Sequence, residues 1–148
     1  MTDESFMAQA LAEAEKSLKR GEVPVGAVVI LEGRIISRGH NMPISKKDPT
    51  AHAEIIAIKK ACQKLSNYRL PACDLYVTLE PCAMCMGAAI QARIRRLVFG
   101  AQDPKSGAVK SIMDFPIERT NHKMEVKGGV MAEECSRVLK KFFLDKRH

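Results

Sequence analysis

The sequence lacks any long apolar run, any tandem repeat and any stretch rich in proline, glycine and serine. No segment approaches the roughly 18–20 consecutive apolar residues of a membrane helix, so none is predicted. Because no linker divides the 148 residues, we expect one domain over 1–148. The residues Met1–Glu4 are acidic and polar, which is not typical of a secretory signal peptide.

The chain also lacks a paired set of cysteines, since it has five. An odd number without a secretory signal argues against a disulfide framework. These residues are therefore expected to be free thiols or metal ligands in a reducing compartment, and we expect a cytoplasmic protein.

Basic residues outnumber acidic ones by 24 to 17, which gives a formal net charge of +7. With 46% hydrophobic and 28% charged residues, the composition is that of a folded globular protein and excludes a disordered chain. A domain this basic is typical of proteins that bind polyanions, because neutralised phosphates release counterions. Solubility alone explains the charge equally well, so both interpretations stay open.

Hydrophobic periodicity predicts alternating helices and strands. Helices are expected at 6–18, 51–65, 81–92 and 132–146, and strands at 23–31, 34–38, 74–79, 95–100 and 124–127. Polar or irregular segments are expected at 41–50, 101–110 and 111–122, with one short helix in the last. Three of the strands are apolar nearly throughout, as in strands buried on both faces. The pattern predicts an α/β fold with a mixed sheet covered by helices on both sides.

Cys82 and Cys85 form a C-x-x-C motif where a strand gives way to a helix. Their spacing places both sulfurs on one side of the first helical turn, and the helix N-terminus favours thiolates. Pro81 suits that first turn, because it has no amide proton to leave unpaired. The motif alone fits a redox pair, half of a zinc site, or two unrelated buried cysteines.

His52 starts another predicted helix, 30 residues before Cys82. One histidine and two cysteines make three zinc ligands, which is the number in catalytic zinc sites that keep a fourth position for water. His52-Ala53-Glu54 together with Pro81-Cys82-x-x-Cys85 is the H-x-E…P-C-x-x-C signature of zinc-dependent nucleobase deaminases. A lone histidine at such a position is more often a capping or hydrogen-bonded residue than a metal ligand.

Glu54 is the expected acid–base residue. Residues two apart lie about 200° around a helix, so His52 and Glu54 share a target only if it lies beyond the helix end. A zinc ion with two thiolates sums to zero charge (2 − 2), and a neutral site acidifies water less, so a neighbouring base is useful. Glu54 can take a proton from water, which attacks C6 of adenine or C4 of cytosine, and can return protons as ammonia leaves. The plainer interpretation is a favourable acid in a first helical turn.

Beyond these motifs, the chain resembles the bacterial tRNA-specific adenosine deaminases of the cytidine and deoxycytidylate deaminase superfamily. The H-x-E and P-C-x-x-C motifs are also shared by deaminases of cytosine, guanine and cytidine. The matching segments span almost the whole chain and include 22–27, 40–41, 48–54, 67–70, 75–82, 98–101, 103, 105–108, 111–114, 121–122 and 142–143. Lys110 and the 115–120 segment depart from the family pattern.

This resemblance implies a cytidine-deaminase-like three-layer α/β/α fold with a mixed five-stranded sheet, in a single zinc-dependent nucleic-acid deaminase domain. It implies one Zn(II) ion per subunit of a homodimer. The reaction it implies is hydrolytic deamination of adenosine to inosine at the wobble position of a tRNA anticodon stem-loop.

The resemblance also assigns substrate-binding roles by position. Asn41 would hydrogen-bond the flipped base, since an amide both donates and accepts, and Val25 and Ala53 would line its pocket. Residues implied beside the neighbouring RNA are Asp103, Lys105, Asn121, His122 and Phe143, with the basic Lys140, Lys141, Lys146 and Arg147.

Simpler roles remain open for some of these residues. Asn41 fits a turn, His122 fits a loop hydrogen bond, and the basic residues fit a solvated helix face. Phe142 and Phe143 are adjacent, so only one of them can face the core from a single helix.

Three alternative functions also remain. They are a zinc deaminase of free bases or nucleosides, a non-catalytic zinc-bearing RNA-binding subunit, and a redox protein.

Overall fold

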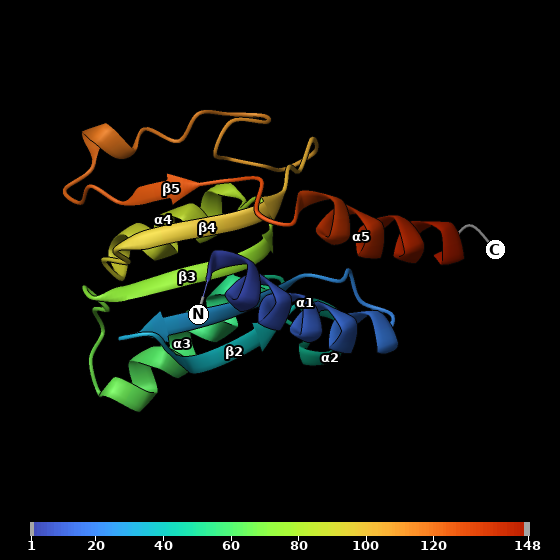
Figure 1. Ribbon diagram of the computed structural model, residues 1–148, viewed down its shortest axis with the longest axis horizontal. Coiled ribbons are helices and arrows are strands. Elements are labelled where there is room, and N and C mark those ends of the chain that lie inside the picture. Colours follow the sequence, from blue (N-terminus) through green and yellow to red (C-terminus); the bar gives the residue numbers. More distant parts are fainter. Residues whose placement is uncertain (1, 147–148) are drawn as a thin grey trace.

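The computed structural model describes residues 2–146 and contains five strands, five α-helices and one short 3-10 helix (Figure 1). The strands are β1 (Gly26–Leu31), β2 (Arg34–His40), β3 (Cys73–Leu79), β4 (Arg96–Ala101) and β5 (Glu125–Lys127). The helices are α1 (Asp3–Lys19), α2 (Pro43–Lys46), α3 (Ala53–Leu65), α4 (Ala83–Gln91), α5 (Ala132–Lys146) and the 3-10 helix η1 (Ile117–Arg119).

The five strands form one mixed sheet in the order β2-β1-β3-β4-β5. β1 pairs antiparallel with both β2 and β3, whereas β3, β4 and β5 run parallel. Parallel neighbours need a crossover, and α4 supplies the one between β3 and β4. The carboxyl ends of β3 and β4 therefore lie at one edge of the sheet, and the segments that follow them leave from that edge.

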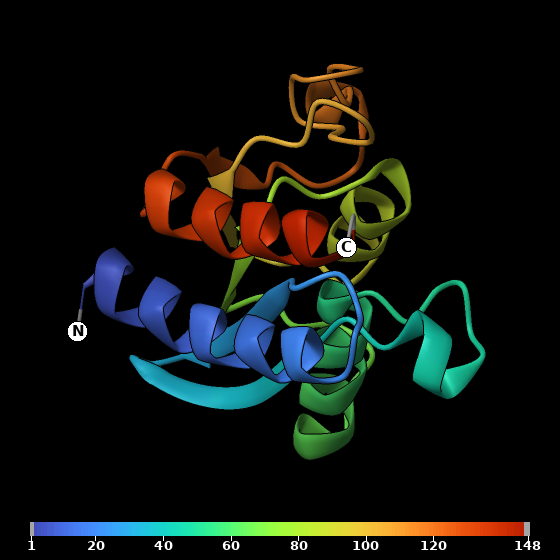
Figure 2. The same cartoon turned by 90° about the vertical axis from the view of Figure 1, so that its right-hand side faces the viewer.

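Helices cover both faces of the sheet, which gives three layers. One core joins the sheet to α3 and α4, and a second core on the opposite face joins it to α1 and α5. Figure 2 shows α1 and α5 side by side on their face. Because strands β1, β3 and β4 are buried almost throughout, they contribute side chains to both cores. This confirms the predicted α/β architecture.

Gly39 sets how closely α3 lies against β2. A Cβ atom there would lie 2.5 Å from the Ala53 carbonyl oxygen and 2.8 Å from the Ala57 nitrogen, which is closer than packed atoms come. The Ser37 hydroxyl group donates a hydrogen bond to the Ala57 carbonyl oxygen at 2.7 Å in the same contact. The start of α3 is therefore fixed against the sheet by a glycine and a hydroxyl group of β2.

Several predicted boundaries are wrong. Residues 23–25 precede β1, and 51–52 and 81–82 precede their helices, so Pro81 is not in the first turn of α4. The expected polar loop at 41–50 contains α2, which the sequence did not predict. Gly21 follows the end of α1 with a φ of +73°, as expected of a helix stop. The short helix expected within 111–122 is η1.

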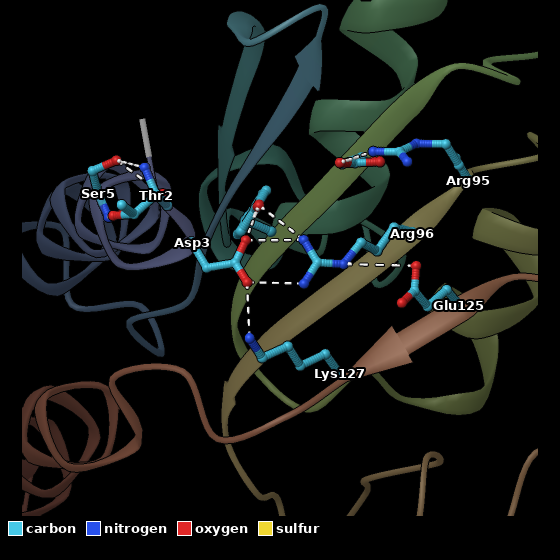
Figure 3. A network of polar contacts seen from close by, with 9 residues as sticks. Thr2, Asp3, Ser5, Arg95, Arg96, Glu125 and Lys127 are labelled. Carbon is cyan, nitrogen blue, oxygen red and sulfur yellow. Dashed lines mark hydrogen bonds and ion pairs between the residues drawn. The ribbon is translucent and has the colours of Figure 1, made fainter.

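Polar side chains link the start of α1 to β3, β4 and β5 (Figure 3). The Asp3 carboxylate accepts two hydrogen bonds from Arg96, at 2.9 and 2.8 Å, and one each from Tyr76 at 2.5 Å and Lys127 at 3.0 Å. Arg96 above all holds the pKa of Asp3 well below its usual range. Arg96 is the first residue of β4, so its ion pair with Asp3 lies toward the amino end of that strand. Among residues 2–146, no helix is long and apolar enough to cross a membrane.

Candidate active site

Three metal-ligating side chains come together where α3 and α4 begin. His52 and Cys82 are the N-cap residues of the two helices, and Cys85 lies in the first turn of α4. The Nδ1 atom of His52 is 3.6 Å from the sulfur of Cys82 and 3.6 Å from that of Cys85. The structure thus unites two motifs that are 30 residues apart in the sequence.

These distances fit a tetrahedral metal ion. Bonds of about 2.3 Å to sulfur and about 2.0–2.1 Å to nitrogen, at tetrahedral angles, would place each sulfur about 3.5–3.6 Å from the nitrogen. All three ligand atoms lie within 4.8 Å of one another. The two nitrogen–sulfur distances therefore fit a metal ion shared by His52, Cys82 and Cys85, and three protein ligands leave one coordination position for another group.

The two thiols differ in the acidity that the surrounding protein groups give them. The hydrogen bond from Cys85, and next to it His52, lowers the pKa of Cys82 to about 4. The same bond to Cys82, together with burial, raises the pKa of Cys85 well above its usual range. The hydrogen bond between His52 and Cys82 also raises the pKa of His52. The cluster thus favours a thiolate at Cys82, the form that binds metals.

Glu54 lies in the first turn of α3 and is only 4% exposed. Its carboxyl group interacts electrostatically with His52 and Cys82 and by hydrogen bonding with Cys85, so it lies beside the cluster. Burial raises the pKa of Glu54 to about 7. A carboxyl group with a pKa near neutrality can both accept and donate protons at physiological pH.

Asn41 is held by three hydrogen bonds. Its N–H donates to the Val25 carbonyl oxygen at 3.0 Å, and its own carbonyl oxygen accepts from the Ser17 hydroxyl group at 2.8 Å. Its side-chain Oδ1 accepts the N–H of Ala53 at 2.8 Å, at the start of α3. The Nδ2 group is therefore the donor left for a ligand, and Oδ1 keeps one further lone pair.

Val25 and Ala53 both belong to the core between the sheet and α3, with 4% and 0% of their surface exposed. Asp103 and Lys105 lie in the loop that leaves the carboxyl end of β4. The Asp103 side chain accepts hydrogen bonds from backbone N–H groups within this loop, and the Lys105 ammonium lies 5.8 Å from the ring centroid of Phe143. The structure thus brings Lys105 and Phe143 together.

Phe143 is 47% exposed, whereas the adjacent Phe142 is buried, so one ring faces the core and the other does not. Lys140, Lys141 and Lys146 are exposed on α5. Arg147, the fourth predicted basic residue of this helix end, lies outside the described residues.

Asn121 and His122 lie at the other edge of the sheet. The His122 Nε2 atom is hydrogen-bonded to the Ile94 carbonyl oxygen at 2.5 Å, just before the amino end of β4. β4 runs from Arg96 to Ala101, and six residues at about 3.3 Å each separate this edge from the edge near Cys82. Within one chain, these two residues are therefore remote from the ligand cluster.

Sequence reasoning missed two buried glutamates that hold the loops beside the cluster. Glu22 accepts hydrogen bonds from two backbone N–H groups and one hydroxyl group of α2. Glu80 accepts five from the segment after β4. Burial acts to raise the pKa of Glu80, but the bonds from Ser111 and the backbone outweigh it and lower the pKa to about 2. An acid that follows a buried strand was the only local signal for Glu80.

A family model described as MafB19-like deaminase matches residues 1–147. Two curated relatives named tRNA-specific adenosine deaminase come from Bacillus subtilis and Haemophilus influenzae. The first is 46% identical over 98% of this chain and 91% of that protein, and the second is 51% identical over 98% and 85%.

Solved structures give the same result. One, from work on A-to-I editing by tRNA:A34 deaminases at the wobble position, is 50% identical with a TM-score of 0.88 and covers 91% of this chain and 99% of its own. A guanine deaminase from Nitrosomonas europaea is 26% identical with a TM-score of 0.79, over 94% and 83% of the two chains. Since family model, relatives and fold agree, the chain belongs to the deaminase family and, within it, to the tRNA-specific adenosine deaminases.

Proposed function

We propose that this protein is a zinc-dependent enzyme that deaminates adenosine to inosine at the wobble position of a tRNA anticodon. The observation that carries the proposal is the meeting of His52, Cys82 and Cys85 at two helix starts, with the buried Glu54 facing the same point. The relatives named tRNA-specific adenosine deaminase supply the substrate class.

His52, Cys82 and Cys85 are the residues that would hold the zinc ion, one per subunit. A bound zinc ion supplies Lewis acidity and lowers the pKa of water. With two thiolates and a neutral imidazole, the protein ligands cancel the charge of the ion (2 − 2 = 0), so the site relies on a protein base for proton transfer. Glu54 is the acidic group that reaches this point.

Glu54 moves the protons of the reaction. It accepts one proton from the water that attacks C6 of the adenine ring and passes it to the ring nitrogen, and it then moves the second proton, from the hydroxyl group now on C6, to the leaving amino group. The bond from C6 to the amino nitrogen breaks, the water oxygen stays on C6, and ammonia leaves. A pKa near 7 suits both halves of this exchange, because the group must be ionised first and protonated later.

Asn41 would orient the base. Its Oδ1 is engaged by the N–H of Ala53, so its Nδ2 group would donate to a ring nitrogen of the flipped adenine. An anticodon loop presents bases outside a duplex, so extruding one requires less free energy than from paired RNA. Asp103, Lys105 and Phe143 would contact the flanking nucleotides.

We also propose the homodimer and the single-domain organisation that the resemblance implies. Asn121 and His122 lie far from the cluster of their own chain, so a role beside the RNA would have to be filled at the site of the partner subunit. A tRNA substrate implies a cytoplasmic place of action.

The decisive experiment incubates the purified protein with an anticodon stem-loop that carries adenosine at the wobble position. Sequencing should detect inosine at that position alone, and metal analysis of the same sample should give one zinc ion per chain. Absence of inosine from a zinc-loaded sample would contradict the proposal.

A second candidate function is deamination of a free base. The structural similarity to the guanine deaminase of Nitrosomonas europaea favours it, because the same fold holds a free purine deaminase. Guanine, cytosine and adenine should be offered to the same preparation, and ammonia release from these free bases without inosine in the stem-loop would support this function instead.

A further inference from the structure

Glu80 lies between the metal-binding segment and the loop that follows β4. It comes directly after β3 and two residues before Cys82, and it is only 3% exposed. Its own N–H donates to the Ala101 carbonyl oxygen at 2.8 Å, which joins the carboxyl ends of β3 and β4. The Glu80 side chain therefore starts from a rigid point beside the ligand cluster.

Five donors from the loop 102–111 converge on this one carboxylate. Oε1 accepts the N–H of Asp103 at 3.1 Å and the hydroxyl group of Ser111. Oε2 accepts the N–H groups of Val109, Lys110 and Ser111 at 2.9, 2.9 and 3.1 Å. Hydrogen bonds to a charged acceptor are stronger than neutral ones, so the two ends of the loop are held by a single side chain.

Gly107 allows the loop to close over the carboxylate. A Cβ atom at this position would lie 2.4 Å from the Cδ atom of Glu80. The next residue donates its N–H to the Pro81 carbonyl oxygen at 2.8 Å, and Pro81 adjoins the ligand Cys82. The backbone of the loop is thus hydrogen-bonded directly to the segment that carries Cys82.

The same loop exposes Lys105, whose ammonium group lies 5.8 Å from the ring centroid of Phe143. We infer that Glu80 is a positioning residue: it touches no substrate and fixes the loop 102–111 relative to Cys82, so that the loop can hold RNA on one side of the reacting base. This inference rests on the proposed function for its substrate and on the contacts above for the anchoring itself.

The test replaces Glu80 by Gln, which keeps the shape but turns an NH₂ group toward backbone N–H groups. Amide hydrogen exchange should become at least about tenfold faster at 103 and 109–111 and stay unchanged in β1 and α3. With a stem-loop substrate, KM should rise about tenfold while kcat changes less than about threefold, as expected when binding contacts are lost equally in ground and transition states. Zinc content should equal that of the wild type.

A second variant, Gly107→Ala, separates the loop from Glu80 without removing the carboxylate and should reproduce the same exchange and KM changes. Glu22→Gln is the matched control for exchange, because it removes a buried carboxylate with backbone partners in a different loop. It should speed exchange at 44–45 and not at 109–111.

Unchanged exchange at 109–111 in Glu80→Gln would overturn the anchoring. Loss of zinc, or a fall in kcat at constant KM, would overturn the role in RNA positioning and assign Glu80 to the metal site. If the wild-type protein does not act on the stem-loop, the proposed function fails, while the exchange measurement still decides whether Glu80 anchors the loop.

Discussion

Two loops border the ligand cluster, and they are held in different ways. The segment between β2 and α3 is fixed at several points: Glu22 binds α2, Asn41 binds the start of α3, and Ser17 binds the backbone of Asn41. The loop 102–111 depends mainly on Glu80. The Ala108 N–H adds one further bond, to the Pro81 carbonyl oxygen. Anchoring spread over several side chains tolerates the loss of one contact better than anchoring that rests mainly on one side chain, so the two loops should respond unequally to similar mutations.

The largest expected effect comes from a change at Glu54, the proposed acid–base residue beside the ligand cluster that both loops border. Glu54→Gln keeps the size of the side chain but cannot exchange protons, so kcat should fall about 10³-fold or more with zinc and fold retained. Timed assays of inosine formation measure kcat, and metal analysis measures the zinc content. Activity close to that of the wild type would show that Glu54 does not take part in the reaction.

The second-largest expected effect is on stability, and it compares Glu80 and Glu22, the glutamates that hold the two loops. Glu80→Gln should lower the free energy of unfolding by about 3 kcal/mol and Glu22→Gln by about 2 kcal/mol, because buried donors lose a charged acceptor in each case. The difference follows from five donors on Glu80 against three on Glu22. Urea unfolding with equal m-values measures it. A larger loss for Glu22→Gln would reverse the comparison.

A smaller effect should come from the serine in each loop. Ser111→Ala leaves four donors on Glu80 (5 − 1), whereas Ser45→Ala leaves two on Glu22 (3 − 1). Each loss should lower stability by about 1 kcal/mol. Amide exchange should accelerate more at 44–45 in Ser45→Ala than at 109–110 in Ser111→Ala, and the opposite order would show that donor number does not govern these loops.

Asp3 should affect neither loop, because its main partner Arg96 begins β4, whereas the loop 102–111 leaves the other end of that strand. Its pKa is lowered in the folded protein, so its stabilising contribution is present above the unfolded pKa and is lost as the pH falls toward the folded value. Asp3→Asn should lower the free energy of unfolding by about 2 kcal/mol at pH 7, and the difference should shrink below about pH 4. Kinetics with the stem-loop should match the wild type. A raised KM would mean that general loss of stability, rather than loop release, explains the Glu80 result.

The sequence predicts the sheet layers and the ligand cluster because both depend on local patterns. Apolar strands reveal burial on two faces, and the two motifs at helix starts carry the chemistry within a few residues each. The geometric condition on Glu54 could also be stated in advance from helical spacing, and the carboxyl group interacts with the ligand residues.

The missed features depend on distant partners. α2 has four residues and is held by Glu22, which lies 22 residues from Ile44, so no local pattern marks it. The same holds for Glu80, whose donors begin 23 residues later at Asp103. Asn121 and His122 carry no periodic signal, and only the topology shows that they lie at the amino ends of the parallel strands.

The helix starts at His52 and Cys82 have a consequence for folding. Neither N-cap side chain bonds to its own helix, although a serine or aspartate there would typically contribute about 1 kcal/mol. Both helices thus lack an N-cap hydrogen bond and carry at that position a side chain that can bind a shared metal ion. Removal of a bound metal ion by a chelator should therefore unfold the first turns of both helices together. Metal binding and the formation of these turns should then occur as one cooperative event.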